Sequence, residues 1–329
     1  MTQPVPHAST RPPLRLALAL ATLAVAAIPL TALLAQDRGT EAAFTVVESG
    51  QGFARLQDAV DAIGDARGTI AIAPGTHRQC AVQSAGTISY MASVPGEAIF
   101  DSVTCEGKAA LVLRGRSAEI SGLTFTGMAV PDVNGAGIRL EKGDLTVANS
   151  WFRDSQQGIL TGPEPSGTIV IDRSTFSGLG TCEGSGGCAH SIYTGEYGNV
   201  RITNSRFERG QGGHYVKTRA AQVDIASSSF DDSNGRQTNY MIDLPAGASG
   251  QISNNYFVQG QSKENYSTFI AVAAESRDNP SAGLRVVGNH ARFAPGVDRR
   301  STFVGDWSGE VSQVRDNVLA PNLESYGTR

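Results

Sequence analysis

The chain has 329 residues, of which 18% are charged and 38 are glycines, a composition that indicates an all-β protein with many tight turns. Its formal net charge is −4, and without a basic stripe to follow phosphates it is not expected to bind nucleic acid. The length alone allows one large domain or two ordinary ones.

The first segment predicts export from the cytoplasm. Residues 16–35 form an uncharged, mostly apolar run that follows two arginines. Positions 24–26 fit a small-x-small cleavage site, yet the run is long enough to remain as a membrane anchor. We therefore expect residues 1–35 to be a signal peptide or N-terminal membrane anchor. Residues 36–329 should form a single domain that is periplasmic, on the cell surface or secreted.

Residues 53–68 ("FARLQDAVDAIGDARG") predict a short amphipathic helix, which the strand "TIAIAPGTH" (69–77) follows. A helix of this kind is suited to cover the unpaired strand edges at the end of a sheet. Its apolar face consists of Leu56, Ala59, Val60 and Ile63.

From residue 118 onward the sequence repeats itself. Each copy has an aliphatic residue five positions before a phenylalanine and holds about three short strands with no helical stretch. These features predict a right-handed parallel β-helix, whose coils stack at ~4.8 Å and whose aligned Phe and Asn/Ser positions form internal ladders. The aligned residues are Phe125, Phe152, Phe176, Phe207, Phe230 and Phe257, with Ala291 and Leu319 in two degenerate copies.

The pattern "LQDAVDA" followed by "GTIAIAPGTH", within residues 56–77, resembles the amino-terminal cap of the pectate-lyase-like superfamily of β-helix proteins. The resemblance covers roughly residues 44 to 320. It implies that the short helix closes the open end of the first coil. It does not imply one reaction, because that superfamily includes lyases, hydrolases, esterases and phage tailspikes.

Four cysteines in an exported chain predict disulfides rather than a metal site. Cys182 and Cys188 enclose a short glycine-rich loop that a bridge closes easily. With a coil of about 25 residues, Cys80 and Cys105 lie one coil apart, and a bridge between them would join adjacent coils. No zinc-binding spacing is present.

Each repeat is preceded by a short strand, and these strands can be aligned on an aliphatic residue that points inward. Because side chains alternate along a strand, the residue that follows the aliphatic one points outward, and these residues form a column from coil to coil. Three members are neighbours on successive coils: Tyr193, Lys217 and Asp243. A surface ion pair between Lys217 and Asp243 would be worth only ~0 to 1 kcal/mol. The convergence of polar side chains in a weakly charged chain favours a ligand groove instead. The expected outer-face residues are Arg139, Tyr193, Tyr215, Lys217, Arg219 and Asp243.

A second column consists of His190, His214 and Tyr240, which precede their strands by equal offsets and should stack on one another. It is either a buried, hydrogen-bonded ladder or a set of groups that orients or deprotonates a catalytic neighbour. Both interpretations remain open at this point.

The groove suits an acidic polysaccharide, since arginines pair with uronate carboxylates and tyrosine faces stack on sugars. A lysine as base and an arginine that neutralises the carboxylate resemble the β-helix polysaccharide lyases, which implies β-elimination. The "HxxKxR" arrangement itself departs from the lyase motifs residue by residue. Arg219 or Arg139 would neutralise the carboxylate, Lys217 would be the base and Tyr193 the proton donor, while Asp243 would orient Lys217 or bind a hydroxyl. We expect Lys217, Arg219, Tyr193, His214 and Asp243 to be catalytic, and Arg139, Tyr215, His190 and Tyr240 to bind substrate.

Two alternatives remain: a non-catalytic glycan-binding or structural cell-envelope β-helix, and a polygalacturonase-like glycoside hydrolase. The hydrolase needs a second carboxylate near Asp243. The candidates Glu196, Asp231, Asp232 and Glu275 do not stack beside it in the predicted register. A Ser-His-Asp esterase is disfavoured because no Gly-x-Ser-x-Gly turn occurs. We expect a monomer without a cofactor. Calcium stays an open alternative, as does glycosylation at "NYS" (265–267).

Overall fold

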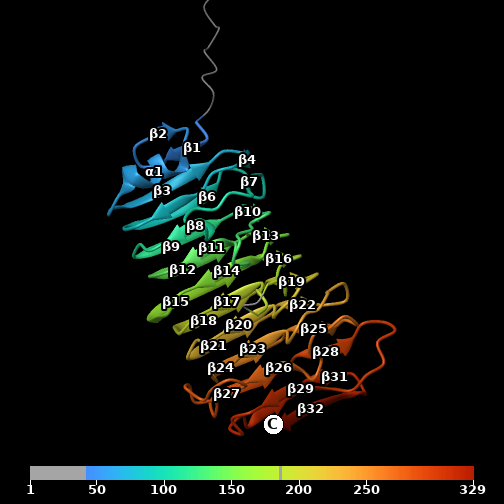
Figure 1. Ribbon diagram of the computed structural model, residues 1–329. Coiled ribbons are helices and arrows are strands. Elements are labelled where there is room, and N and C mark those ends of the chain that lie inside the picture. Colours follow the sequence, from blue (N-terminus) through green and yellow to red (C-terminus); the bar gives the residue numbers. More distant parts are fainter. Residues whose placement is uncertain (1–41, 185–186) are drawn as a thin grey trace, which may run out of the picture. The chain divides into compact units, whose positions relative to one another are not determined.

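The computed structural model describes residues 42–184 and 187–329, which form a parallel β-helix with one short helix (Figure 1). The predicted leader, residues 1–35, lies outside the described residues. Three sheets run along the solenoid, and we name them A, B and C. Strands pair in parallel from coil to coil, except that β1 pairs antiparallel with β2 and β3.

Sheet A contains twelve strands in the order β2 (Gln51–Phe53), β1 (Phe44–Val46), β3 (Arg67–Ile72), β6 (Thr87–Ala92), β9 (Ser117–Ser121), β12 (Asp144–Ala148), β15 (Glu164–Asp172), β18 (Tyr197–Thr203), β21 (Gln222–Ala226), β24 (Ser249–Ser253), β27 (Leu284–Val287) and β30 (Gln313–Arg315). Sheet B contains ten: β4 (Gly75–His77), β7 (Ala98–Asp101), β10 (Leu123–Thr126), β13 (Trp151–Arg153), β16 (Thr175–Ser177), β19 (Arg206–Glu208), β22 (Ser229–Asp231), β25 (Tyr256–Gln259), β28 (His290–Phe293) and β31 (Val318–Leu319). Sheet C contains ten: β5 (Ala81–Gln83), β8 (Ala109–Leu113), β11 (Ala136–Leu140), β14 (Gln157–Thr161), β17 (Ile192–Thr194), β20 (Val216–Thr218), β23 (Ile242–Leu244), β26 (Thr268–Val272), β29 (Ser301–Asp306) and β32 (Leu323–Thr328).

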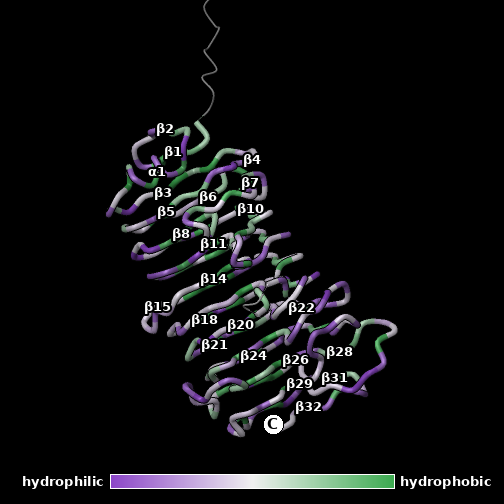
Figure 2. Tube along the Cα trace, viewed as in Figure 1, coloured by the Kyte–Doolittle hydropathy of each residue, from purple (hydrophilic) through white to green (hydrophobic). Residues whose placement is uncertain are grey.

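The predicted phenylalanine ladder lies inside sheet B. From Phe125 to Phe257, consecutive rings are nearly parallel with centroids 4.8–4.9 Å apart, which matches the spacing of the strands that carry them. All six side chains are buried. Apolar positions recur on coil after coil along the chain (Figure 2), so each coil buries its inner face against the next.

The predicted Asn/Ser ladder stands beside it, at the turn from sheet A to sheet B. Here the side-chain oxygen of one coil accepts a hydrogen bond from the backbone N–H of the coil before. Ser174 Oγ accepts from Ser150 at 3.2 Å, and Asn289 Oδ1 accepts from Asn255 at 3.0 Å. These bonds satisfy buried backbone donors where the chain leaves the sheet.

The predicted capping helix is α1 (Leu56–Ile63), and its four predicted apolar residues are buried. It also closes the free edge of sheet C. Gln57 Oε1 accepts a 2.8 Å hydrogen bond from the backbone N–H of Val82 in β5, and Gln57 Nε2 donates to the carbonyl of Val82 at 3.1 Å. The side chain thus supplies the partners that a further strand would supply.

Both predicted disulfides are present. Cys80 and Cys105 lie in the turns before β5 and β8, neighbouring strands of sheet C, so their bridge joins two coils. The second bridge joins Cys182 and Cys188. Among the described residues, no helix is long and apolar enough to cross a membrane.

Candidate functional site

The predicted outward column is present on sheet C. Tyr193 of β17 pairs in register with Lys217 of β20, and Lys217 pairs with Asp243 of β23. The column borders a cavity of ≈ 440 Å³ that lies between the outer face of sheet C and the turns leading into it from sheet B. Residues that line this cavity, hereafter the groove, include Gln157, His190, Tyr193, His214, Lys217 and Glu264.

An ion-pair network surrounds Lys217. Its Nζ lies 3.5 Å from Asp243 Oδ2 and 2.6 Å from Glu275 Oε1, and 5.5 Å from the centre of the Tyr193 ring. The guanidinium of Arg219 binds the other oxygen of Glu275, and its Nε donates to Tyr193 Oη at 3.2 Å. The Lys217 side chain is only 12% exposed and that of Asp243 4%, so these charges interact in a weakly screened environment.

Glu275 is the member of this network that the sequence did not place. The predicted register does not stack it beside Asp243, and in the structure it follows β26 in an irregular turn. The turn bends back: the backbone N–H groups of Glu275 and Ser276 both donate to the carbonyl of Pro245, each at 2.9 Å. Glu275 therefore shares the ammonium of Lys217 with Asp243.

The predicted ladder of His190, His214 and Tyr240 is also present. Ring centroids lie 4.9 Å apart for the two histidines and 5.4 Å apart for His214 and Tyr240. His190 Nδ1 accepts a 3.0 Å hydrogen bond from the backbone N–H of His214. Burial, reinforced by Lys217, lowers the pKa of His190 to about 3, so its neutral ring carries the proton on Nε2.

His214 faces Asp243 across a 3.4 Å gap between Nε2 and Oδ2. Burial lowers the pKa of His214 well below its usual value, and His190 and Lys217 add to this effect. Burial also raises the pKa of Asp243 to about 6, although Lys217 pulls it down. Both pKa shifts favour the uncharged form of a buried group.

Tyr215 was expected on the outer face, and this prediction is wrong. The side chain is 1% exposed and packs in the core. The strand β20 begins only at Val216, so the alternation that places Lys217 outward does not extend back to Tyr215. Unlike the residues of the column, Tyr215 does not line the groove.

Two other predicted residues stand apart from the network. Arg139 is separated from Tyr193 by Leu160, which lies between them in register, and its Nε is 3.6 Å from Glu141. Tyr240 contacts the ladder, and its hydroxyl accepts a 2.8 Å hydrogen bond from Asn265, the asparagine of the "NYS" triplet.

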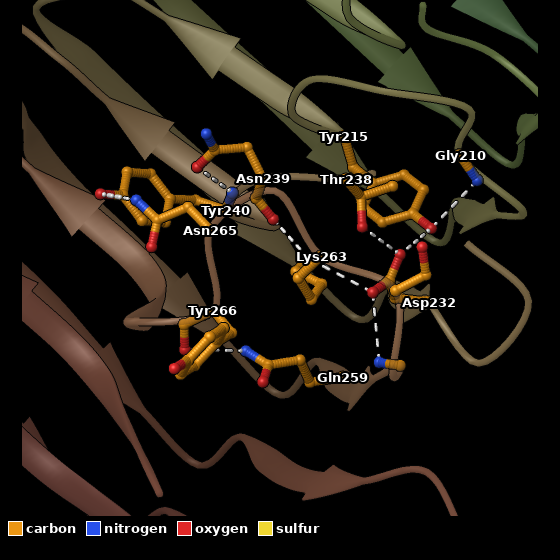
Figure 3. Close-up of polar contacts among 12 residues, drawn as sticks. Gly210, Tyr215, Asp232, Thr238, Asn239, Tyr240, Gln259, Lys263, Asn265 and Tyr266 are labelled. Carbon is orange, nitrogen blue, oxygen red and sulfur yellow. Dashed lines mark hydrogen bonds and ion pairs between the residues drawn. The ribbon is translucent and has the colours of Figure 1, made fainter. Parts of the chain in front are cut away.

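A fully buried ion pair joins the turns that lead into sheet C (Figure 3). Lys263 Nζ lies 3.3 Å from Asp232 Oδ2, and both side chains are at most 1% exposed. Asp232 Oδ1 accepts hydrogen bonds from the hydroxyls of Tyr215 and Thr238 at 2.8 and 2.7 Å. Lys263 also donates to the carbonyl of Asn239, so the pair ties together the turns that precede β20, β23 and β26.

The match to known proteins agrees with this architecture. A family model described as "Right handed beta helix region" matches residues 109–292, more than half of the chain. The chain belongs to the right-handed β-helix family. The predicted right-handed parallel β-helix is therefore confirmed.

Similar solved structures are pectin methylesterases. One from Aspergillus niger, in deglycosylated form, has a TM-score of 0.52 and 11% identity, covering 84% of this chain and 87% of its own. The penultimately deglycosylated form has a TM-score of 0.50 and 12% identity, with coverages of 79% and 87%. At these identities the likeness shows the fold alone. No curated protein matches the chain.

Proposed function

We propose that this β-helix protein cleaves an acidic, uronate-containing polysaccharide by β-elimination. The observation that carries the proposal is the pairing of two cations with one carboxylate at the groove. Lys217 and Arg219 both bind Glu275, whose side chain is 44% exposed and can therefore move away. A uronate carboxylate has the charge and the two oxygens to take the same position.

The contacts of Lys217 favour a role in neutralising the substrate carboxylate, whereas the sequence predicts that Lys217 is the base. Its Nζ forms ion pairs with two carboxylates, Asp243 at 3.5 Å and Glu275 at 2.6 Å. An ammonium cannot accept a proton, so we assign Lys217 and Arg219 to neutralising the substrate carboxylate. Neutralisation makes the proton on the adjacent carbon more acidic.

His214 and Asp243 are then the proton acceptor. His214 is neutral, and the carboxyl of Asp243, with a pKa of about 6, is ionised at neutral pH but accepts a proton readily. The pair takes the C5 proton, the C4–O bond breaks, and a C4=C5 double bond forms. Tyr193, held by Arg219 through its hydroxyl, gives its proton to the leaving oxygen.

We also place the protein outside the cytoplasm, in the periplasm, on the cell surface or in the medium. The two disulfides support this location, because such bridges persist in oxidising compartments. An acidic polysaccharide outside the cell is thus its proposed partner.

The test is ultraviolet absorbance of the protein incubated with alginate, pectate, glucuronan and acidic bacterial exopolysaccharides. Growing absorbance from a 4,5-unsaturated uronate supports the lyase, and Lys217→Met should abolish it. Lys108→Met is the matched control, since Lys108 also pairs with two carboxylates, Glu106 and Glu141, but does not line the groove. Reducing ends without absorbance would indicate a hydrolase, and methanol released from methyl-esterified pectin would indicate an esterase. A flat result in every assay, with calcium included, would favour a non-catalytic glycan-binding or structural protein.

A further inference from the structure

The ladder of His190, His214 and Tyr240 has a fourth member on the coil before it. Gln157 stands two residues before the inward Ile159, the same offset that separates His190 from Ile192. The two isoleucines pair in register. Gln157 is the first residue of β14, and His190 lies in the turn just before β17. Both line the groove, on the N-terminal side of Lys217.

Gln157 presents an unpaired acceptor. Its side chain is 1% exposed, and its Nε2 donates to Asn134 Oδ1 at 2.7 Å. Asn134 Nδ2 in turn donates to the carbonyl of Asp132, which fixes the orientation of both amides. Gln157 Oε1 has no hydrogen-bond partner within the described part of the chain. A buried acceptor left unpaired costs free energy, and a ligand that donates to it recovers that cost.

His190 presents the complementary donor. Its Nδ1 is already used by the backbone N–H of His214, and its ring is neutral, so Nε2 carries a proton. No hydrogen bond engages Nε2 among the residues that the structure describes. An N–H donor and a carbonyl acceptor thus line the same groove, and neither carries a net charge.

We propose that Gln157 and His190 form a subsite that binds two adjacent hydroxyl groups of a sugar residue. One hydroxyl donates to Gln157 Oε1, and its neighbour accepts from His190 Nε2–H. This inference rests on the proposed function for the class of ligand, and it adds the sugar unit next to the one whose carboxylate meets Lys217. A sugar whose hydroxyls are esterified cannot donate to Gln157 and leaves the acceptor unpaired.

Affinity electrophoresis measures this selectivity without requiring turnover. The probes are alginate, pectate and glucuronan, each with and without chemical O-acetylation of its ring hydroxyls. We expect at least one unmodified polymer to bind about tenfold more tightly than its acetylated form, the effect of one hydrogen bond to a buried group. Gln157→Met should bring this ratio close to one, and His190→Phe should lower it independently.

Gln259→Met is the matched control. Gln259 is also a fully buried glutamine whose Oε1 has no partner, but it does not line the groove, so the variant should keep the selectivity. A ratio near one in the unmodified protein, a ratio that Gln157→Met leaves intact, or no binding to any polymer would overturn the subsite. Selective binding without unsaturated product would instead reject the lyase and leave the subsite standing.

Discussion

Glu275 follows Lys217 by 58 residues in the sequence, yet its Oε1 lies 2.6 Å from Lys217 Nζ. The contact spans two coils and exists because the turn after β26 bends back over sheet C. It places a carboxylate of the protein on the two cations that we assign to the substrate. The network around Lys217 is therefore complete before any ligand binds, and a substrate must compete with Glu275.

This competition predicts opposite effects for two substitutions. Glu275→Gln removes the internal carboxylate's charge and should lower KM for an acidic polysaccharide severalfold. Lys217→Met removes a cation from the transition state and should lower kcat/KM by a factor on the order of 10² or more. Initial rates at several substrate concentrations measure both. A higher KM in Glu275→Gln would show that Glu275 binds substrate rather than competing with it.

The raised pKa of Asp243 predicts an acidic limb in the pH profile. Below a pH of about 6 its carboxyl is protonated and cannot accept the C5 proton, so kcat/KM should fall about tenfold per pH unit. His214 stays neutral in this range because its pKa is lowered. Asp243→Asn should lower the rate and remove the limb. An unshifted limb in that variant would assign the titration to another group.

The same shift makes a prediction about stability. Between the ordinary pKa of 3.8 and about 6, the folded protein binds a proton at Asp243 more tightly than the unfolded chain does. The contribution of this group to the free energy of unfolding therefore decreases as pH rises through that window. Thermal unfolding of the protein and of Asp243→Asn, measured from pH 4 to 7, gives the comparison. The Tm of the variant should increase relative to that of the unmodified protein as pH rises.

The buried pair of Asp232 and Lys263 should be important for folding. Asp232→Asn leaves the ammonium of Lys263 buried without a counter-charge and should cost about 3–5 kcal/mol of the free energy of unfolding. Asp316→Asn is the matched control, because Asp316 pairs with Arg315 at the exposed surface, where such pairs contribute about 0–1 kcal/mol. Similar Tm losses in the two variants would contradict this contrast.

The bridge between Cys80 and Cys105 should stabilise the first coils. It closes a loop of 25 residues, and the loop-closure entropy predicts a loss of about 3 kcal/mol when both cysteines are replaced by serine. The bridge between Cys182 and Cys188 spans a separation of six and should contribute less. Thermal unfolding of the two double variants measures both contributions. A larger Tm loss on removing the Cys182–Cys188 bridge would contradict this prediction.

The sequence by itself determined the β-helix, its capping helix, both disulfides and the neighbours in the column of Tyr193, Lys217 and Asp243. These features depend on two regular periods, the alternation of side chains along a strand and the recurrence of one coil. Where strands pair in parallel with constant register, residues at the same position in successive coils must be neighbours. The phenylalanine ladder follows from the same rule.

Only the tertiary structure decided the positions that depend on turns. Tyr215 points inward because its strand begins one residue later, and Glu275 reaches Lys217 because an irregular turn bends back. Lys263 meets Asp232 in the protein interior. Turn conformations are set by individual backbone dihedrals and by packing against neighbouring coils, and neither has a period that a sequence displays. The two periods therefore predict the column of Tyr193, Lys217 and Asp243. The conformations of the turns determine which other side chains contact that column.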